Sequence, residues 1–114
     1  MIETSKEPGV VKAVFCKVGE TPRIVELPDL GESTYLEIKK LVGGHPQQVR
    51  MGKFDFICDA DRGLKGKPVN RMLPDGRTIT GDFVILAFSP HWLVGLSDSE
   101  ANWLVHDLIT VEGK

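Results

Sequence analysis

One stretch of the sequence, residues 81–88, limits the folds that this chain can form. It reads Gly-Asp-Phe-Val-Ile-Leu-Ala-Phe, with six consecutive apolar residues and no charge after the aspartate. Phenylalanine, valine and isoleucine favour the pleated surface of a sheet, and a short run between Gly81 and Ser89-Pro90 is typical of a strand covered on both faces. The run is far shorter than the roughly 20 residues of a membrane helix. We therefore predict that it is the central strand of a sheet.

The composition indicates a single globular domain. Of the 114 residues, 41% are hydrophobic and 26% are charged, which is ordinary for such a domain. A domain of this length buries roughly two thirds of the surface that its unfolded chain exposes, so it needs neither a disulfide nor a metal to fold. Residues 1–8 are polar, with no apolar core behind their charges. We expect a flexible tail over 1–8, without a signal peptide, and one α+β domain over 9–110.

The charge balance limits the classes of partner that we expect, and the cysteines indicate the cellular compartment. The formal net charge of −2 gives no positive field that would gather phosphates, which argues against sequence-independent binding of nucleic acid. Cys16 and Cys58 each lie in an apolar run and are expected to pack as small hydrophobic side chains. With reduced thiols and no signal peptide, the expected location is the cytoplasm, which is the host cytoplasm if a phage encodes the chain. No membrane partner is expected.

Hydrophobic periodicity predicts the order of the elements. Strands are predicted over 10–18, 23–27 and 54–59, with a weaker one at 47–51, an extended segment at 68–73, a lead-in at 77–80 and a last strand at 91–96. Helices are predicted from about 30 to 42 and from 97 to about 109. The predicted fold class is α+β, with a mostly antiparallel sheet of five or six strands and two helices packed on one face.

Three signals mark the ends of the two helices. Asp29 is placed to accept the free amide hydrogens at the start of the first helix. Gly43 and Gly44 are expected to end it, because glycine adopts the left-handed cap without a steric penalty. Ser97 and Glu100 form a capping box at the start of the second helix.

Four segments of the chain share a pattern with a known family. They are Leu41-Val42-Gly43-Gly44, Asp59-Ala60-Asp61-Arg62-Gly63-Leu64-Lys65-Gly66, Pro68-Val69-Asn70-Arg71 and Ile79-Thr80-Gly81-Asp82-Phe83-Val84-Ile85. In this order and spacing they resemble the domain of unknown function numbered thirty-eight forty-six, found in small proteins of phages, plasmids and bacteria. Its members carry a helix ending in Val-Gly-Gly, a segment similar to Asn-Glu-Glu-Gly-Lys-Leu-x-Gly-Leu-Pro-x-Asn-Arg, and then Gly-Thr-Phe and a hydrophobic residue. The resemblance covers about residues 10–105.

The chain differs from this family pattern in its second and fourth segments. Counting back from Asn70 puts Asp59 at the family's asparagine, and Arg62 stands where a glycine is usual. Lys67 replaces a leucine and Asp82 replaces a threonine. The turn is therefore expected to be reshaped. The resemblance implies no activity, because the family has none assigned.

Asp59 and Asp61 are the candidate ligands for a cation, because alternate acidic residues in a glycine-containing loop are part of a calcium loop. The third ligand position of such a loop falls on Gly63 and its twelfth residue, where a bidentate glutamate is needed, is Asn70, which favours a solvated turn. An enzyme would use Asp59, Asp61 or Cys58, but no environment in the sequence separates an acid from a base. The histidines are scattered, and neither a Cys-x-x-Cys nor a His-x-x-x-His spacing occurs. No catalytic residue, metal or cofactor is predicted.

Asn70 and Arg71 form the most interesting polar pair. Arginine grips a carboxylate or a phosphate through two parallel hydrogen bonds, so the pair is a candidate binding site. The alternative is that both residues tie the loop to the sheet. Trp92 and Trp103 bracket the last helix, where tryptophan serves either as an interface anchor or as a core residue.

These observations favour a non-catalytic binding protein. In the mobile-element setting that the resemblance implies, it would be a phage or plasmid accessory protein that binds and modulates a host protein, as a counter-defence inhibitor does. The alternative is a protein that binds or sequesters a small nucleotide signal, with Lys65, Lys67 and Arg71 on the phosphates and a tryptophan on the base. A second alternative is a small enzyme. Homo-oligomer formation stays open.

Overall fold

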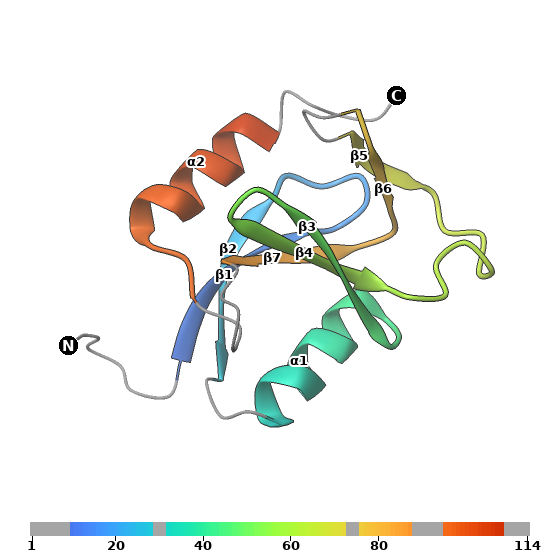
Figure 1. Ribbon diagram of the computed structural model, residues 1–114, viewed down its shortest axis with the longest axis horizontal. Coiled ribbons are helices and arrows are strands. Elements are labelled where there is room, and N and C mark those ends of the chain that lie inside the picture. The colour runs from blue at the N-terminus through green and yellow to red at the C-terminus, as the bar shows by residue number, and fades with distance from the viewer. Residues whose placement is uncertain (1–9, 29–31, 73–75, 88–94, 109–114) are drawn as a thin grey trace.

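A five-stranded sheet forms the centre of the molecule (Figure 1). The computed structural model describes residues 10–28, 32–72, 76–87 and 95–108. In chain order the elements are β1 (Val10–Cys16), β2 (Arg23–Pro28), α1 (Glu32–Val42), β3 (Pro46–Met51), β4 (Phe54–Asp59), β5 (Val69–Met72), β6 (Thr78–Thr80), β7 (Phe83–Ala87) and α2 (Asp98–Leu108). β5 and β6 pair as a separate antiparallel ribbon. The predicted α+β class is confirmed.

β7 is the middle strand of the large sheet. The strand order is β2-β1-β7-β4-β3, and all neighbours are antiparallel. Val84 of β7 pairs with Phe15 of β1 on one side and with Ile57 of β4 on the other. The side chains of residues 83–86 are all buried. The prediction that this apolar run forms a central strand covered on both faces is confirmed.

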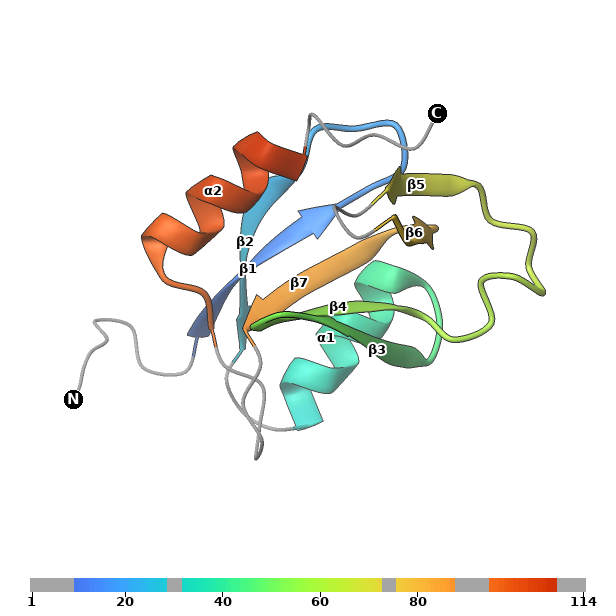
Figure 2. The same cartoon turned by 45° about the horizontal axis from the view of Figure 1, so that its top comes forward.

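The two helices cover opposite faces of the sheet (Figure 2). α1 packs Ile38 and Val42 into a core cluster that contains Val84 of β7. α2 packs Leu104 into a second cluster, which contains Ile85. The prediction that both helices lie on one face is wrong. Successive side chains of a strand point to opposite faces, and because both faces of β7 are apolar, each needs its own cover.

The helix ends follow the predicted signals where the structure describes them. Gly43 has φ +80° and its N–H donates to the Lys39 carbonyl at 2.9 Å, which closes α1. At the start of α2, Glu100 N–H donates to Ser97 Oγ at 3.1 Å, and Ser97 N–H donates to Glu100 Oε1 at 2.9 Å. Gly43 as a cap and the capping box are both confirmed. In the described part of the chain, neither helix is long and apolar enough to cross a membrane.

Some predicted features lie outside the described residues. They include Asp29, the proposed cap of α1, and Trp92, together with residues 91–94 of the predicted last strand. Leu96, from the end of that segment, is buried and does not belong to a strand. Its N–H donates to the Lys12 carbonyl of β1 at 2.8 Å, so the segment before α2 is tied to β1.

Candidate functional site

The first two segments of the family pattern meet at Asp59, the last residue of β4, and Gly81 of the fourth segment lies against Lys67. The carboxylate lies beside the C-terminal end of α1 and beneath the following loop, residues 60–67, called here the 60–67 loop. Figure 2 shows this loop extending away from the sheet between β4 and β5. The site is thus built where a helix end, a strand end and a loop come together.

Asp59 is buried and accepts three hydrogen bonds. Its side chain is 1% exposed. Lys65 Nζ lies 2.6 Å and Lys67 Nζ 2.9 Å from its Oδ2 atom. The N–H of Asp61 donates to Oδ1 at 2.9 Å. The prediction of a solvated turn is wrong for Asp59, because its charge is neutralised inside the protein by the two lysines of its own loop.

The same two ammonium groups also hold the end of α1. Lys65 Nζ donates to the Gly43 carbonyl at 3.0 Å, and Lys67 Nζ donates to the Val42 carbonyl at 3.0 Å. The last carbonyls of a helix have no partner within the helix and carry partial negative charge, so cations stabilise them. Each lysine therefore joins Asp59 to the helix end.

These contacts decide the charge state of Asp59. Burial alone would raise its pKa, but the hydrogen bonds from Lys65, Lys67 and the Asp61 amide together hold the pKa well below its ordinary value. Asp59 is therefore ionised throughout the neutral range.

Two glycines leave room for this network. A Cβ on Gly44 would lie 2.4 Å from Asp59 Oδ1, and a Cβ on Gly81 would lie 2.8 Å from Lys67 Cδ. Gly81 also has φ +78°, a conformation that favours glycine. Both glycines are therefore required by the close approach of side chains to the backbone.

The 60–67 loop is internally hydrogen-bonded and exposes one large apolar side chain. Within it, Lys65 N–H donates to the Asp61 carbonyl at 3.0 Å and Lys67 N–H donates to the Arg62 carbonyl at 3.1 Å. The Arg62 guanidinium donates to Gln47 Oε1 of β3 at 2.7 Å. Leu64, at the tip, is 90% exposed. Leu64 therefore projects from a loop whose backbone is held by hydrogen bonds.

Asn70 and Arg71 are buried and bonded to backbone groups. Asn70 Nδ2 donates to the Cys16 carbonyl at 3.0 Å and to the Gly81 carbonyl at 2.9 Å. Arg71 donates to Asn70 Oδ1 at 2.8 Å and to the Glu20 carbonyl at 2.8 Å. These bonds tie β5 to the β1 end and to the β6–β7 turn, which agrees with the structural alternative. Arg71 is 4% exposed, and its Nε has no partner in the described part of the chain.

The structure brings some of the candidate residues together and separates others. Asp59, Asp61, Lys65 and Lys67 form one network, and Asn70 and Arg71 adjoin it through Gly81. Trp103 stands apart on α2, half-exposed, and stacks on Phe54. His45 and His106 are exposed. The described residues contain no group of three or more histidine, cysteine or acidic side chains placed to hold a metal ion.

Sequence reasoning missed the roles of three residues. Gly44 and Gly81 are packing partners of charged side chains, and Leu64 is the most exposed large apolar residue described. The detectable signal for Leu64 was its place as the single large apolar side chain in a charged, glycine-containing loop. Nothing local marks Gly44 or Gly81, because their contacts come from distant parts of the chain.

The site's chemistry favours a fixed ion pair over proton transfer. A general base works best with a pKa near the operating pH, and the pKa of Asp59 lies far below it. Burial raises the pKa of the Cys58 thiol, Arg62 opposes this, and the Asp59 charge adds to the rise, which disfavours the reactive thiolate. Asp59, Lys65 and Lys67 therefore hold the 60–67 loop in place on the domain.

Comparison with known proteins finds a family for the chain. The model of a family described as Domain of unknown function (DUF3846) matches residues 11–108. No curated protein and no solved structure matches the chain. The matched range includes the whole network around Asp59, the 60–67 loop and both described helices.

Proposed function

The chain belongs to the DUF3846 family, a domain of unknown function, and from that premise we propose that it is a non-catalytic protein that binds and modulates another protein. The contact element is the 60–67 loop, with Leu64 as its anchor. In the phage or plasmid setting that the sequence resemblance implies, the partner is a host protein, such as a defence or replication factor whose working surface is blocked.

The exposure of Leu64 on a braced loop carries this proposal. Single exposed apolar side chains are common on protein surfaces and need no explanation by themselves. Leu64 differs because its loop is already ordered by hydrogen bonds and by the lysine contacts to Asp59. A preorganised loop loses little conformational entropy on binding, so most of the gain from burying the leucine, about 1.5–3 kcal/mol, remains available.

The charged side chains beside Leu64 indicate what chemistry the partner's surface should have. Lys65 is 43% exposed although its ammonium group contacts Asp59, and Arg62 lies at the base of the loop. Asp61 of the same loop is also exposed, so a complementary pocket is apolar at its centre and carries charges of both signs at its rim. Rim charges of this kind raise the association rate and the specificity more than the affinity.

The non-catalytic part of the proposal is supported by how the reactive groups are engaged. Asp59 is held ionised by two lysines, and burial raises the pKa of both thiols, to about 12 for Cys16. The ion-paired Asp59 carboxylate and the two buried, protonated thiols stabilise the fold. To act on a substrate, Asp59 would have to lose its lysine partners and each thiol would have to become an exposed thiolate.

A small anion is a second candidate ligand, and one observation favours it. Arg71 Nε is buried without a hydrogen-bond partner in the described residues, so one donor of this guanidinium is not used there. Lys65 and Lys67 are engaged with Asp59, and a nucleotide phosphate would have to displace that carboxylate. Calorimetry with a panel of nucleotides tests this candidate. A heat of binding that is lost in Arg71→Lys supports the small-anion candidate. If no nucleotide gives a heat of binding, this candidate is excluded.

The protein-binding proposal is tested by comparing matched surface variants. The tagged wild-type protein, Leu64→Ser and Met72→Ser are each used to capture proteins from a bacterial lysate. Met72 is also an exposed large apolar residue, but it lies on β5, outside the loop. We expect a captured protein that is depleted about tenfold or more by Leu64→Ser and retained by Met72→Ser.

Two outcomes contradict the proposal. One is the same recovery with both variants, and the other is no protein above background with the wild type. A photoreactive amino acid at position 64 adds a direct readout, because a true partner cross-links from the loop tip.

A further inference from the structure

A buried arginine without an acidic partner lies where three parts of the chain meet. Arg71 of β5 is 4% exposed and bonds to the turn between β1 and β2, while its neighbour Asn70 bonds to the turn between β6 and β7. Figures 1 and 2 both show β5 beside the loop that joins β1 to β2. We call this place the Arg71 junction, and it consists of Cys16, Glu20, Asn70, Arg71 and Gly81.

The guanidinium of Arg71 uses only part of its hydrogen-bonding capacity. Nη1 donates to the Asn70 carbonyl at 3.0 Å and to Asn70 Oδ1 at 2.8 Å, and Nη2 donates to the Glu20 carbonyl at 2.8 Å. These bonds use both N–H groups of Nη1 and one of Nη2. Nε is buried and has no partner in the described residues. The Nε–H and one N–H of Nη2, two donors of one rigid planar group, therefore remain for a ligand.

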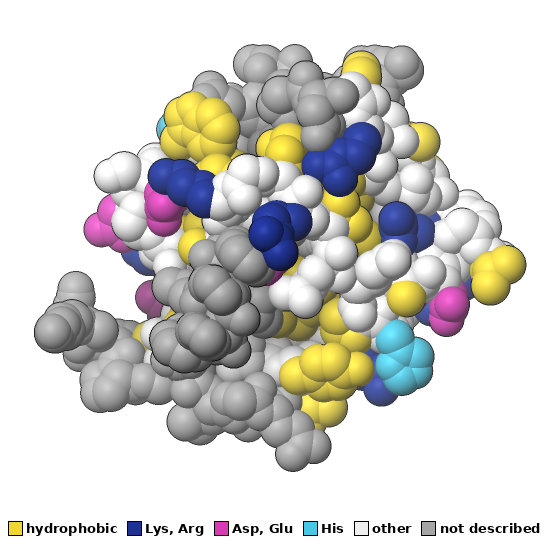
Figure 3. Space-filling view, viewed as in Figure 1, with side chains coloured by type: hydrophobic (Ala, Val, Ile, Leu, Met, Phe, Trp, Pro, Cys, Tyr) yellow, Lys and Arg dark blue, Asp and Glu magenta, His cyan; other side chains and the backbone are white. Residues whose placement is uncertain are grey.

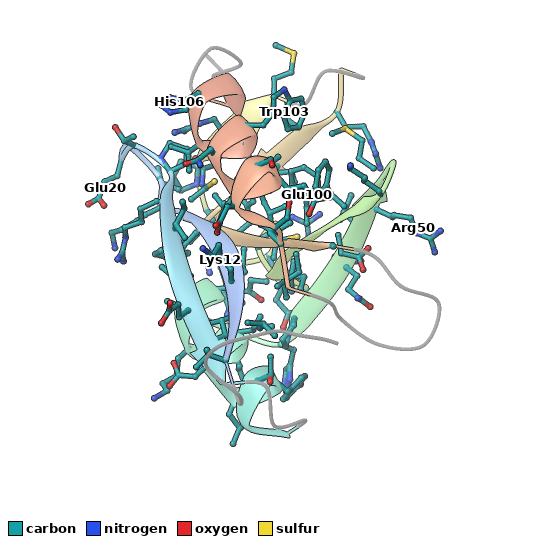
Figure 4. All side chains as sticks on the ribbon, turned by 90° about the vertical axis from the view of Figure 1, so that its left-hand side faces the viewer. Lys12, Glu20, Arg50, Glu100, Trp103 and His106 are labelled. Carbon is teal, nitrogen blue, oxygen red and sulfur yellow. The ribbon has the colours of Figure 1, made fainter. Side chains whose placement is uncertain are left out.

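The positive charge of Arg71 is also uncompensated among the described residues. All of its acceptors are neutral amide oxygens. Glu20 meets Arg71 through its backbone carbonyl, and Figure 4 shows the Glu20 side chain extending outward from the domain. Asp82, in the adjoining β6–β7 turn, accepts the Val18 N–H instead of pairing with Arg71. A buried charge without a partner is strongly unfavourable, so a counter-ion is expected at this junction.

Burial distinguishes Arg71 from the other cationic side chains that the structure describes. Figure 3 shows dark blue Lys and Arg side chains scattered over the face that it draws, where water solvates them. Arg71 is the only buried lysine or arginine among the described residues. Lys65 and Lys67, the cations of the neighbouring 60–67 loop, already have Asp59 as their counter-ion. A specific anion would therefore gain most at Arg71.

We propose that the Arg71 junction binds a small free oxyanion, a phosphate or a carboxylate, as a structural component of the domain. Two oxygens of the anion accept the Nε–H and the remaining Nη2 N–H, because arginine binds both kinds of group through two parallel hydrogen bonds. The anion neutralises the guanidinium and so stabilises the contact between β5 and the β1–β2 turn. This structural role is independent of the protein contact proposed for the 60–67 loop.

The small β5–β6 ribbon provides a route by which an anion reaches this buried group. Among the described strands, β5 and β6 pair only with each other, and a ribbon of two strands is marginally stable by itself. Asn70 holds the ribbon through its bonds to the Cys16 and Gly81 carbonyls. Local opening of the ribbon would expose Arg71 without unfolding the large sheet. A free anion needs a smaller opening than a nucleotide or a protein segment does.

The test titrates sodium phosphate, and separately sodium acetate, into the full chain with isotopically labelled arginine, while sodium chloride keeps the ionic strength constant. We expect the Nε–H resonance of Arg71 to shift until it saturates. At an anion concentration about ten times the dissociation constant, its hydrogen exchange with water should slow about tenfold, because opening then requires release of the anion. Arg23, an exposed arginine over the Phe15 ring, is the control in the same spectra and should show no saturable shift.

A pair of variants tests the site through stability. Phosphate is expected to raise the midpoint of thermal unfolding of the wild type above its value in sodium chloride of equal ionic strength. Arg71→Lys keeps the positive charge but loses the paired donors, so this increase should disappear. Lys40→Gln, at an exposed lysine paired with Glu37, is the matched control and should keep the increase. If Arg71→Lys fails to fold, the Nε–H resonance of the wild type still decides.

Saturation by either oxyanion supports the inference, and the anion that saturates identifies the group as phosphate or carboxylate. Three results overturn it. They are the absence of a saturable shift with both anions, equal shifts at Arg71 and Arg23, and a long-lived water that stays in contact with the Arg71 Nε–H when either anion is present. Leu64→Ser should bind the anion like the wild type, so failure of this inference is distinguishable from failure of the proposed loop contact.

Discussion

Gly44 and Asp59 are in direct contact: the carboxylate occupies the space in which any other residue at position 44 would carry its Cβ, 2.4 Å from Oδ1. The glycine that follows the cap of α1 is therefore required by a side chain from β4. The helix end and the ion pair form one structural unit.

Replacing Gly44 with alanine tests this contact through a double-mutant cycle. Gly44→Ala is expected to destabilise the wild type by about 1–3 kcal/mol, because the methyl group overpacks the carboxylate. In an Asp59→Ala background the same change should lower the free energy of unfolding by less than about 0.5 kcal/mol. The carboxylate that the methyl group would meet is then absent, and alanine reduces the conformational entropy of the unfolded chain. Denaturant unfolding of the four proteins measures the coupling. Additive effects would show that the two residues do not interact.

Asp59→Asn is expected to lower the free energy of unfolding by about 3 kcal/mol, near the lower end of the range for breaking a buried ion pair. The lower end applies because Lys65 is partly exposed and regains water. Asp61→Asn is the matched control. The side chain of Asp61 is exposed and its contact with Asp59 uses the backbone amide, so a change within about 0.5 kcal/mol is expected. A similar loss in both variants would contradict the network.

The pH dependence of stability should carry the signature of Asp59. Its folded pKa is lower than the ordinary value of 3.8, so the unfolded state binds the proton more readily. The stabilisation is complete well above pH 3.8 and is lost as the pH falls below that value, at no more than about 1.4 kcal/mol per pH unit for this group. The gap in unfolding free energy between the wild type and Asp59→Asn should therefore narrow in acid. A gap that is constant with pH would exclude the ion pair as its cause.

The thiols should react only when the protein unfolds. Burial raises the pKa of Cys16 to about 12, with a smaller opposing effect from Arg71, and burial also raises the pKa of Cys58. Alkylation with iodoacetamide is expected to be at least about a hundredfold slower in the native state than in guanidinium chloride, as followed by mass spectrometry. Rapid labelling of either native cysteine would contradict the burial described above.

The sequence predicted the features that depend on neighbouring residues. The central strand follows from the apolar run at 83–88, and the α2 capping box follows from Ser97 and Glu100, because propensity and capping act within a few positions. The apolar residues on both faces of β7 require a cover on each face, but the face that each helix covers depends on how the chain crosses the sheet, which is not a local property. That prediction therefore failed although its elements were confirmed.

The candidate site shows the same limit. Asp59, Lys65 and Lys67 were identified from the loop pattern, but the burial of Asp59 and the contacts of the two lysines depend on the end of α1, about 15–25 residues earlier in the chain. Alternate acidic residues look like a solvated turn until the helix end that covers Asp59 is placed, and Asp61 does remain exposed. Leu64 was recognisable as an exception in a polar loop, whereas the contacts of Gly44 and Gly81 required the fold.

The central position of β7 in the sheet affects how the chain folds while it is being synthesised on the ribosome. β1 and β4, its two partners, are made long before it, and neither can pair on its inner side until residues 83–87 have emerged. Chains are synthesised at about 5–20 residues per second, so these two edges wait for seconds with apolar side chains exposed. The nascent chain is most vulnerable to aggregation and proteolysis in that interval, which ends only when β7 and then α2 have been made.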